Sequence, residues 1–142
     1  MKARRIAYWV ATALTAYVFL AGGAVYLTRP KFVTDELTRL GYPAHFVLLL
    51  GVWKALGGAA VLAPGLPRLK EWAYAGMFFN LTAAAATHAA AGDPAFKTVT
   101  PLVILGVVMT SWALRPESRR LRDGAGQAVG RPAPAEEAFG VA

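Results

Sequence analysis

The chain has 142 residues, of which 56% are hydrophobic and only 16% are charged. Soluble domains carry about 25% charged residues, so this composition indicates a membrane protein. The net charge of +7 does not indicate nucleic acid binding, because the basic residues bracket apolar segments and form no patch with interleaved aromatic residues. The absence of cysteine excludes a disulfide framework, cysteine-ligated zinc, iron–sulfur clusters and a thiol relay within the chain.

The first apolar segment, residues 6–28, contains no charge and follows Lys2, Arg4 and Arg5. A secretory signal peptide begins in the same way, but its apolar core usually has about 7–15 residues. The longer run here, and the three apolar segments that follow it, favour a first transmembrane helix.

The polar connection at residues 29–43 is expected to contain a short amphipathic helix. Thr34 is expected to cap its N-terminus, and Gly41 to end it. The helix has one apolar face, made of Val33, Leu37 and Leu40. This pattern predicts a helix that lies on the membrane surface or covers the mouth of a bundle.

Three further spans are predicted at residues 44–63, 71–91 and 98–114. Short loops join the spans, so we expect an all-α, antiparallel four-helix bundle in one domain, residues 1–115. The 71–91 span is rich in small residues, nearly all of them alanine, and it is therefore expected to be the most buried. Residues 116–142 lack an apolar period and are expected to form a disordered tail.

The distribution of basic residues predicts the orientation. With four spans, both termini lie on the same side of the membrane. That side collects ten lysine and arginine residues and the other side four, with Lys54 between them. By the positive-inside rule, both termini are expected in the cytoplasm.

Lys54 lies in the middle of the second span, about 15 Å from either end. A charge at that depth costs about 2.5–3.5 kcal/mol or more, so the lysine should face the interior of the bundle. Counting inward along the spans places Tyr17 and Asn80 near the same depth, and no carboxylate. The lysine is then neutral, binds an anionic or carbonyl-bearing ligand, or meets an acid from a partner chain. Alternatively, it bonds to Tyr17 or Asn80 and only fixes helix packing.

The two histidines, His45 and His88, are predicted near the outer ends of neighbouring spans. Such a pair can ligate a b-type haem, but interfacial or packing roles are favoured. His88 shares the helix face of Asn80, so it is expected to line a path from outside towards Lys54. Glu71 is explained by the dipole at the start of its helix. The sequence predicts no catalytic residue and no metal site.

Residues 40–93 resemble the DoxX-like family of small four-helix integral membrane proteins. The resemblance rests on Leu40-Gly41-Tyr42-Pro43, Gly51, Lys54, Gly57, Gly58, Pro64, the run from Lys70 to Gly76, His88, Gly92 and Asp93. It implies a four-span bundle in a bacterial plasma (inner) membrane. The family's lysine, glutamate and histidine positions map to Lys54, Glu71 and His88, and Gly58 and Asp93 are further motif positions with an expected structural role.

Relatives in the family are often labelled as quinone-linked oxidoreductase subunits or as membrane partners of redox enzymes, and others resemble assembly factors. The favoured hypothesis is an accessory subunit of a membrane redox system, with a quinone or similar ligand held by Lys54, Tyr17, Asn80 and His88. The alternatives are a non-catalytic assembly or scaffolding protein, or a small transporter that works as a homo-oligomer. Enzyme action by the chain alone is least supported, because the sequence shows no acid–base pair at a reactive spacing.

Overall fold

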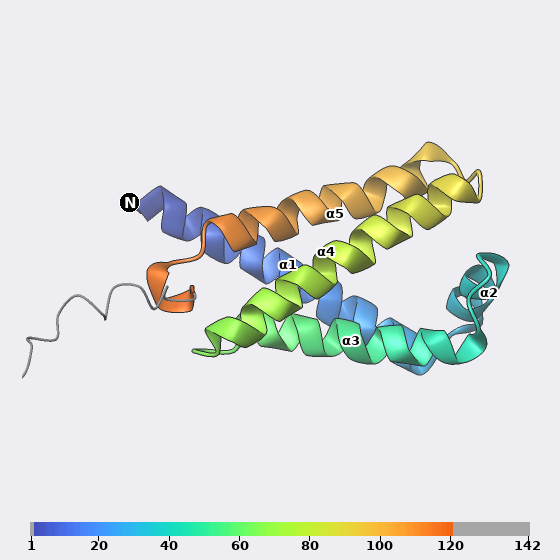
Figure 1. Ribbon diagram of the computed structural model, residues 1–142, viewed down its shortest axis with the longest axis horizontal. Helices are drawn as coiled ribbons and strands as arrows, with labels where there is room; N and C mark the ends of the chain where they lie inside the picture. Colours follow the sequence, from blue (N-terminus) through green and yellow to red (C-terminus); the bar gives the residue numbers. More distant parts are fainter. Residues whose placement is uncertain (1, 121–142) are drawn as a thin grey trace, which may run out of the picture.

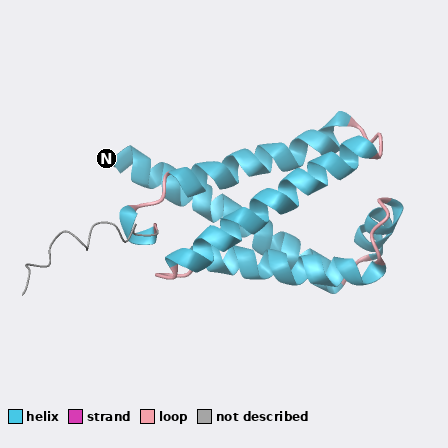
Figure 2. Ribbon diagram, viewed as in Figure 1, coloured by secondary structure: helices cyan, strands magenta, loops and turns pink. Residues whose placement is uncertain are grey.

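Four long helices lie side by side in the computed structural model, which describes residues 2–120 (Figure 1). Within these residues the protein is all-helical and contains no strand (Figure 2). The elements are α1 (Lys2–Thr28), α2 (Lys31–Arg39), α3 (Ala44–Leu62), α4 (Pro67–Ala90), α5 (Ala95–Ala113) and the short 3-10 helix η1 (Glu117–Arg119).

The long helices contact one another in a ring. Helix α1 packs against α3 and α5, and α4 packs against α5 and α3, while α2 packs against α3. The start of α1, the α3–α4 turn and the end of α5 share one end of the molecule, which we call the basic end (Figure 1). Helix α2 and the α4–α5 loop share the other end, which we call the clasp end because side chains from separate segments bond to each other there.

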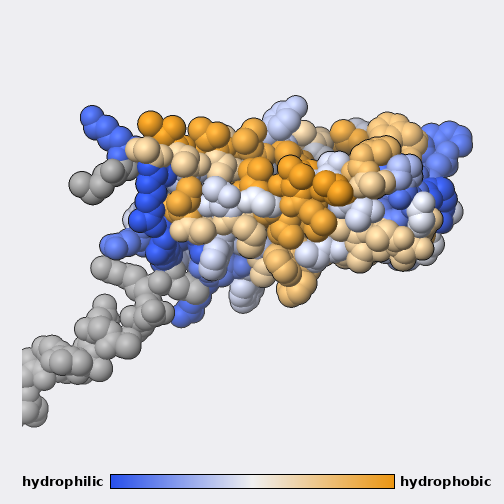
Figure 3. Space-filling view, turned by 90° about the horizontal axis from the view of Figure 1, so that it is seen from above, coloured by the Kyte–Doolittle hydropathy of each residue, from blue (hydrophilic) through white to orange (hydrophobic). Residues whose placement is uncertain are grey.

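Three of the helices, α1, α3 and α5, are long and apolar enough to cross a membrane. Helix α4 has 24 residues but carries Arg68, Lys70 and Glu71 in its first turns, which lower its hydropathy. Figure 3 shows a broad apolar band between hydrophilic groups at the two ends of the molecule. Large exposed side chains such as Trp53, Phe79 and Val103 contribute to this apolar surface, as expected for helices that face lipid.

Helix α2 confirms that the connection contains a short helix, but the predicted cap is wrong. The helix begins at Lys31, after Pro30, and Thr34 lies inside it and donates to Lys31 O at 2.9 Å. The N-cap residue is Pro30, whose carbonyl accepts from Val33 N–H at 2.9 Å and from Thr34 N–H at 3.2 Å, and no side chain caps this end. At the other end Gly41 has φ +88° and Tyr42 N–H donates to Leu37 O, which closes the helix as a Schellman motif.

Three other helices begin earlier than expected. Helix α1 begins at Lys2, α4 at Pro67 and α5 at Ala95, so the basic residues just before each predicted span belong to the helix. Hydropathy marks only the part of a helix that prefers lipid, and helices continue beyond it. Of the predicted tail at 116–142, the described part contains η1, and residues 121–142 lie outside the described range.

The most extensive helix contact joins α1 and α3, and does not involve α4, which the sequence predicted to be the most buried helix. A Cβ built on Gly23 would lie 2.8 Å from Ala55 N, and one built on Gly58 would lie 2.8 Å from Leu20 Cγ. A Cβ on Gly76 of α4 would meet no atom within 4 Å. Glycines that face a neighbouring backbone therefore decide which pair approaches closely.

Buried polar groups also join the helices. Tyr74 Oη lies 2.7 Å and Thr12 Oγ1 lies 2.8 Å from Ser111 Oγ, so a hydroxyl chain links α1, α4 and α5. Lys70 is almost completely buried, and its Nζ donates to the last carbonyls of α3. Together these bonds join all four long helices.

Candidate functional site

A cavity of about 600 Å³ lies between α3 and α4. Helix α1 contributes to its floor, and α2 and the α2–α3 connection border its outer part. The lining is mostly apolar and aromatic, and its larger members include Phe19, Tyr26, Tyr42, Trp53, Trp72 and Met77. Trp53 and Trp72 are 63% and 77% exposed, so the cavity has bulky apolar side chains at its outer edge.

Lys54 supplies the charge in this cavity. Its Nζ donates to Asn80 Oδ1 at 3.0 Å, across the gap between α3 and α4. The same nitrogen lies 5.1 Å from the ring centre of Phe19 and 5.5 Å from that of Tyr26, distances at which an aromatic face attracts a cation. Among the described residues no carboxylate pairs with Lys54. A lysine has three N–H donors, so two remain for another acceptor.

The sequence placed Tyr17 beside Lys54, but the structure does not bring them together. Tyr17 is 72% exposed, and it does not line the cavity. Counting residues from a helix end gives depth but not rotation. Phe19 and Tyr26 are seven residues apart and therefore share the helix face that meets α3, whereas Tyr17 is rotated about 200° from Phe19. Phe19 and Tyr26 lie on either side of Gly22 and Gly23 at a spacing of seven residues. This spacing could have identified the face of α1 that meets α3 from the sequence alone.

His88 lines the outer part of the cavity, and Thr87 beside it bonds to Tyr42 at 2.9 Å between the hydroxyl oxygens. His88 and Tyr42 therefore line the same cavity as Lys54, and the path from the outer end remains a prediction. His45 is exposed and does not line the cavity.

A cluster of charged side chains joins α2 to the α4–α5 loop at this end of the cavity. Arg39 bonds to Glu36 at 2.8 Å and to Asp93 at 2.7 Å. Lys97 pairs with Glu36 at 2.6 Å, and His88 Nδ1 lies 2.7 Å from Asp93 Oδ2. We call these five residues the clasp, because they tie the amphipathic helix to the other half of the ring.

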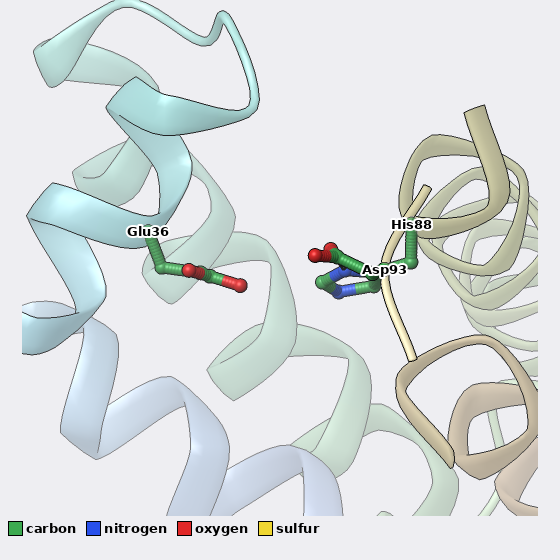
Figure 4. Close-up of side chains that lie close together, drawn as sticks. All are labelled: Glu36, His88 and Asp93. Atoms are coloured by element: carbon green, nitrogen blue, oxygen red, sulfur yellow. Dashed lines mark hydrogen bonds and ion pairs between the residues drawn. The ribbon is translucent and has the colours of Figure 1, made fainter. Parts of the chain in front are cut away.

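Glu36, His88 and Asp93 lie close enough together to share a metal ion, with ligand atoms all within 4.8 Å of one another. Figure 4 shows Glu36 on one side of the gap and His88 with Asp93 on the other. Arg39 and Lys97 already compensate the two carboxylates, so the cluster is balanced without a metal. Hydrogen bonds from Arg39 and Lys97 lower the pKa of Glu36 to about 2, and those from Arg39 and His88 lower the pKa of Asp93 to about 2.

These pKa values predict how the clasp responds to acid. Because the folded carboxyls have pKa values below the ordinary 4.5 and 3.8, their stabilisation is present at neutral pH and is lost as the pH falls towards 2. We expect the double variant Glu36→Gln/Asp93→Asn to melt at a lower temperature than the wild type at neutral pH. We expect the difference to shrink below about pH 4.5.

Asp35 provides the matched control for the clasp, because its pair with Lys31 is highly exposed and stays within α2. The Asp35→Asn variant should melt close to the wild type at every pH. A difference between the double variant and the wild type that does not change with pH would contradict the assignment of these ion pairs.

The comparison with known families fits this architecture. The sequence profile of the DoxX-like family matches residues 10–111, which includes the long helices and the cavity. The chain belongs to the DoxX-like family. No curated protein and no solved structure matches it. The resemblance seen in the sequence is therefore confirmed, and this DoxX-like chain is a membrane protein by its family and its apolar helices.

Three further residues from the resemblance, Glu71, Gly58 and Asp93, do not line the cavity that contains Lys54. Glu71 accepts bonds from Arg115 Nη2 at 2.8 Å and from Trp112 Nε1 at 3.0 Å, so it joins α4 to α5 at the basic end. The dipole explanation for Glu71 is insufficient, because the helix begins four residues before it. Gly58 packs against Leu20 of α1, and Asp93 belongs to the clasp.

Proposed function

We propose that this DoxX-like protein is an accessory subunit of a bacterial plasma-membrane redox system and that its cavity holds a lipid-soluble ligand such as a quinone beside Lys54. The observation that carries the proposal is the Lys54–Asn80 pair, which places an amino group with spare N–H donors in an apolar cavity. A ligand with a carbonyl or anionic head and an apolar body would satisfy both features.

The residues present fit such a ligand. The cavity volume of about 600 Å³ lies within the range of small-molecule sites, about 300–1,000 Å³. Lys54 would donate to a ring carbonyl, and Phe19 and Tyr26 would contact the ring. A bound quinone would supply the redox chemistry. The chain's own residues would bind and orient the ligand, and the exposed edge at Trp53 and Trp72 would admit it from the bilayer.

The same proposal includes four antiparallel spans with both termini in the cytoplasm. Helix α4 would be the fourth span, because 24 residues extend about 36 Å. Its polar first turns are paired internally, through Glu71 with Arg115 and through Lys70 with the end of α3. The basic end would then face the cytoplasm, as the positive-inside rule favours.

Native mass spectrometry of the protein gently extracted from its own membrane tests the ligand. We expect a bound mass matching a quinone, and we expect occupancy to fall about tenfold or more in Lys54→Met, because a charged hydrogen bond contributes about 1.5–3 kcal/mol. Lys31→Met is the matched control, since Lys31 is exposed on α2 and its loss should leave occupancy unchanged.

Three other results would contradict the redox proposal. Full occupancy in Lys54→Met would show that the lysine does not hold the ligand. Co-purification of a protein partner without any small molecule would favour the assembly or scaffolding role. A stable homo-oligomer without a ligand would favour the transporter alternative.

A further inference from the structure

The basic end contains a second cavity, of about 500 Å³, that the Lys54 site does not involve. It lies between the first turns of α1 and the connection from α5 to η1. Its charged lining residues are Arg4, Arg5, Arg115, Glu117 and Arg120. Four arginines therefore face one glutamate in a small space.

Arg115 is the buried member of this group. Its side chain is 4% exposed and is fixed by Glu71 at 2.8 Å from Nη2 and by Trp112 O at 3.0 Å from Nε. The rings of Tyr74 and Trp112 lie 5.0 Å and 5.4 Å from the guanidinium carbon. Nη1 is buried and has no hydrogen-bond partner within the described residues. Buried polar groups normally have partners, so this nitrogen lacks an acceptor.

The other arginines of the cavity carry charges that no acidic side chain compensates within the described residues. Arg120 donates to Arg115 O at 2.8 Å and to Ala113 O at 3.0 Å, and these neutral acceptors leave its charge uncompensated. Arg4 and Arg5 form no ion pair in the part of the chain that the structure describes. Both lie in the first turn of α1, where the positive end of the helix dipole already disfavours cations. An anion in the cavity would relieve both effects.

We propose that this cavity binds a phosphate group, supplied by the head group of an anionic phospholipid. Planar guanidinium groups recognise phosphate through paired N–H donors, which suits a site built from arginine. The position of the cavity along the membrane normal also fits a lipid head group. Trp9 lines the cavity, and Trp9 and Trp112 are both 43% exposed. Tryptophans in such positions mark the level of lipid head groups, and basic pockets at helix ends hold anionic lipids.

The test uses the full chain in nanodiscs of phosphatidylcholine with a minor share of phosphatidylglycerol, followed by native mass spectrometry. We expect the wild type to retain phosphatidylglycerol in preference to phosphatidylcholine. The variant Arg4→Gln/Arg5→Gln should lose that preference by about tenfold. The matched control Lys2→Gln/Arg68→Gln removes two charges from the same end without touching the cavity, and it should retain the lipid. We expect the Arg120→Gln variant to lose the preference for phosphatidylglycerol as well, which gives a second and independent test.

A second arm distinguishes the source of the phosphate. Lipid-depleted protein in detergent is titrated with inorganic phosphate in a calorimeter. Lipid retention without a response to inorganic phosphate supports the head-group assignment. A saturable response that Arg4→Gln/Arg5→Gln removes supports the phosphate site but overturns its assignment to lipid. Equal lipid retention by the two double variants, or no preference in the wild type, overturns the proposal. Neither the lipid measurement nor the phosphate titration depends on whether a quinone occupies the cavity beside Lys54.

Discussion

Replacing Lys70 with methionine is expected to destabilise the protein by about 2–4 kcal/mol, since hydrogen bonds to charged groups contribute about 1.5–3 kcal/mol each and are not additive. The Lys70 side chain is 1% exposed in the protein. Its Nζ donates to Ala60 O at 2.8 Å, to Val61 O at 3.2 Å and to Ala63 O. These carbonyls belong to the end of α3, where the last carbonyls of a helix have no N–H donor within the helix.

Methionine has a similar length and keeps most of the packing of the lysine stem, but it removes the Lys70 donor from Ala60 O and Ala63 O and leaves Val61 O with only Arg119 Nη1, at 3.3 Å. The measurement is the melting temperature in detergent, together with hydrogen exchange of the amides in the last turn of α3. Arg68→Met is the control, because Arg68 lies in the same turn of α4 and is exposed. Equal melting of Lys70→Met and the control would show that Lys70 does not stabilise the end of α3.

Lys70 also shows what the sequence left undetermined. In the sequence it reads as one of the basic residues that flank a span, and the count of such residues predicts orientation. Its burial depends on the turn at Leu66, which adopts φ +52° and starts α4 at Pro67. That turn brings the lysine back onto α3, and neither hydropathy nor charge counting contains this information.

The cavity was predictable in part. Hydropathy located the helices that border it, because the preference of a segment for lipid is a local property. The depth argument also matched Lys54 with Asn80, which the structure joins by a hydrogen bond. The same argument selected Tyr17 instead of Tyr26, since the rotation of α1 is set by its contact with α3 and not by its position in the membrane.

The clasp was not predicted at all. Its ion pairs join residues far apart in the sequence, such as Arg39 with Asp93 and Lys97 with Glu36. Each of these charges has a local explanation as part of a polar loop or a helix end. Their convergence follows from the position of α2 over the α4–α5 loop, and that position depends on the apolar contact of Val33 and Leu37 with Val47. Local patterns cannot give such a pairing without the packing that produces it.

Replacing Gly23 with alanine is expected to destabilise the protein by about 1–3 kcal/mol, the usual range for overpacking a tight contact. The added Cβ would lie 2.8 Å from Ala55 N, 3.0 Å from Gly51 O and 3.1 Å from Ala55 Cα. All three are backbone atoms of α3, so no side chain can rotate to make room. The two helices would have to separate, and this would loosen the wall of the cavity that carries Lys54 and Phe19.

Gly106 provides the control for Gly23, because it also lies inside a long helix but a Cβ there would meet no atom within 4 Å. Alanine favours a helix over glycine by about 1 kcal/mol, so Gly106→Ala should raise the melting temperature slightly. The preference of a helix for alanine also acts at Gly23. Any loss of stability in Gly23→Ala is therefore caused by the steric conflict with α3, which outweighs that preference. A Gly23→Ala protein as stable as Gly106→Ala would mean that α1 and α3 are further apart than described. If the Gly23→Ala variant is destabilised but still binds the proposed ligand, then ligand binding at Lys54 does not depend on the tight contact between α1 and α3.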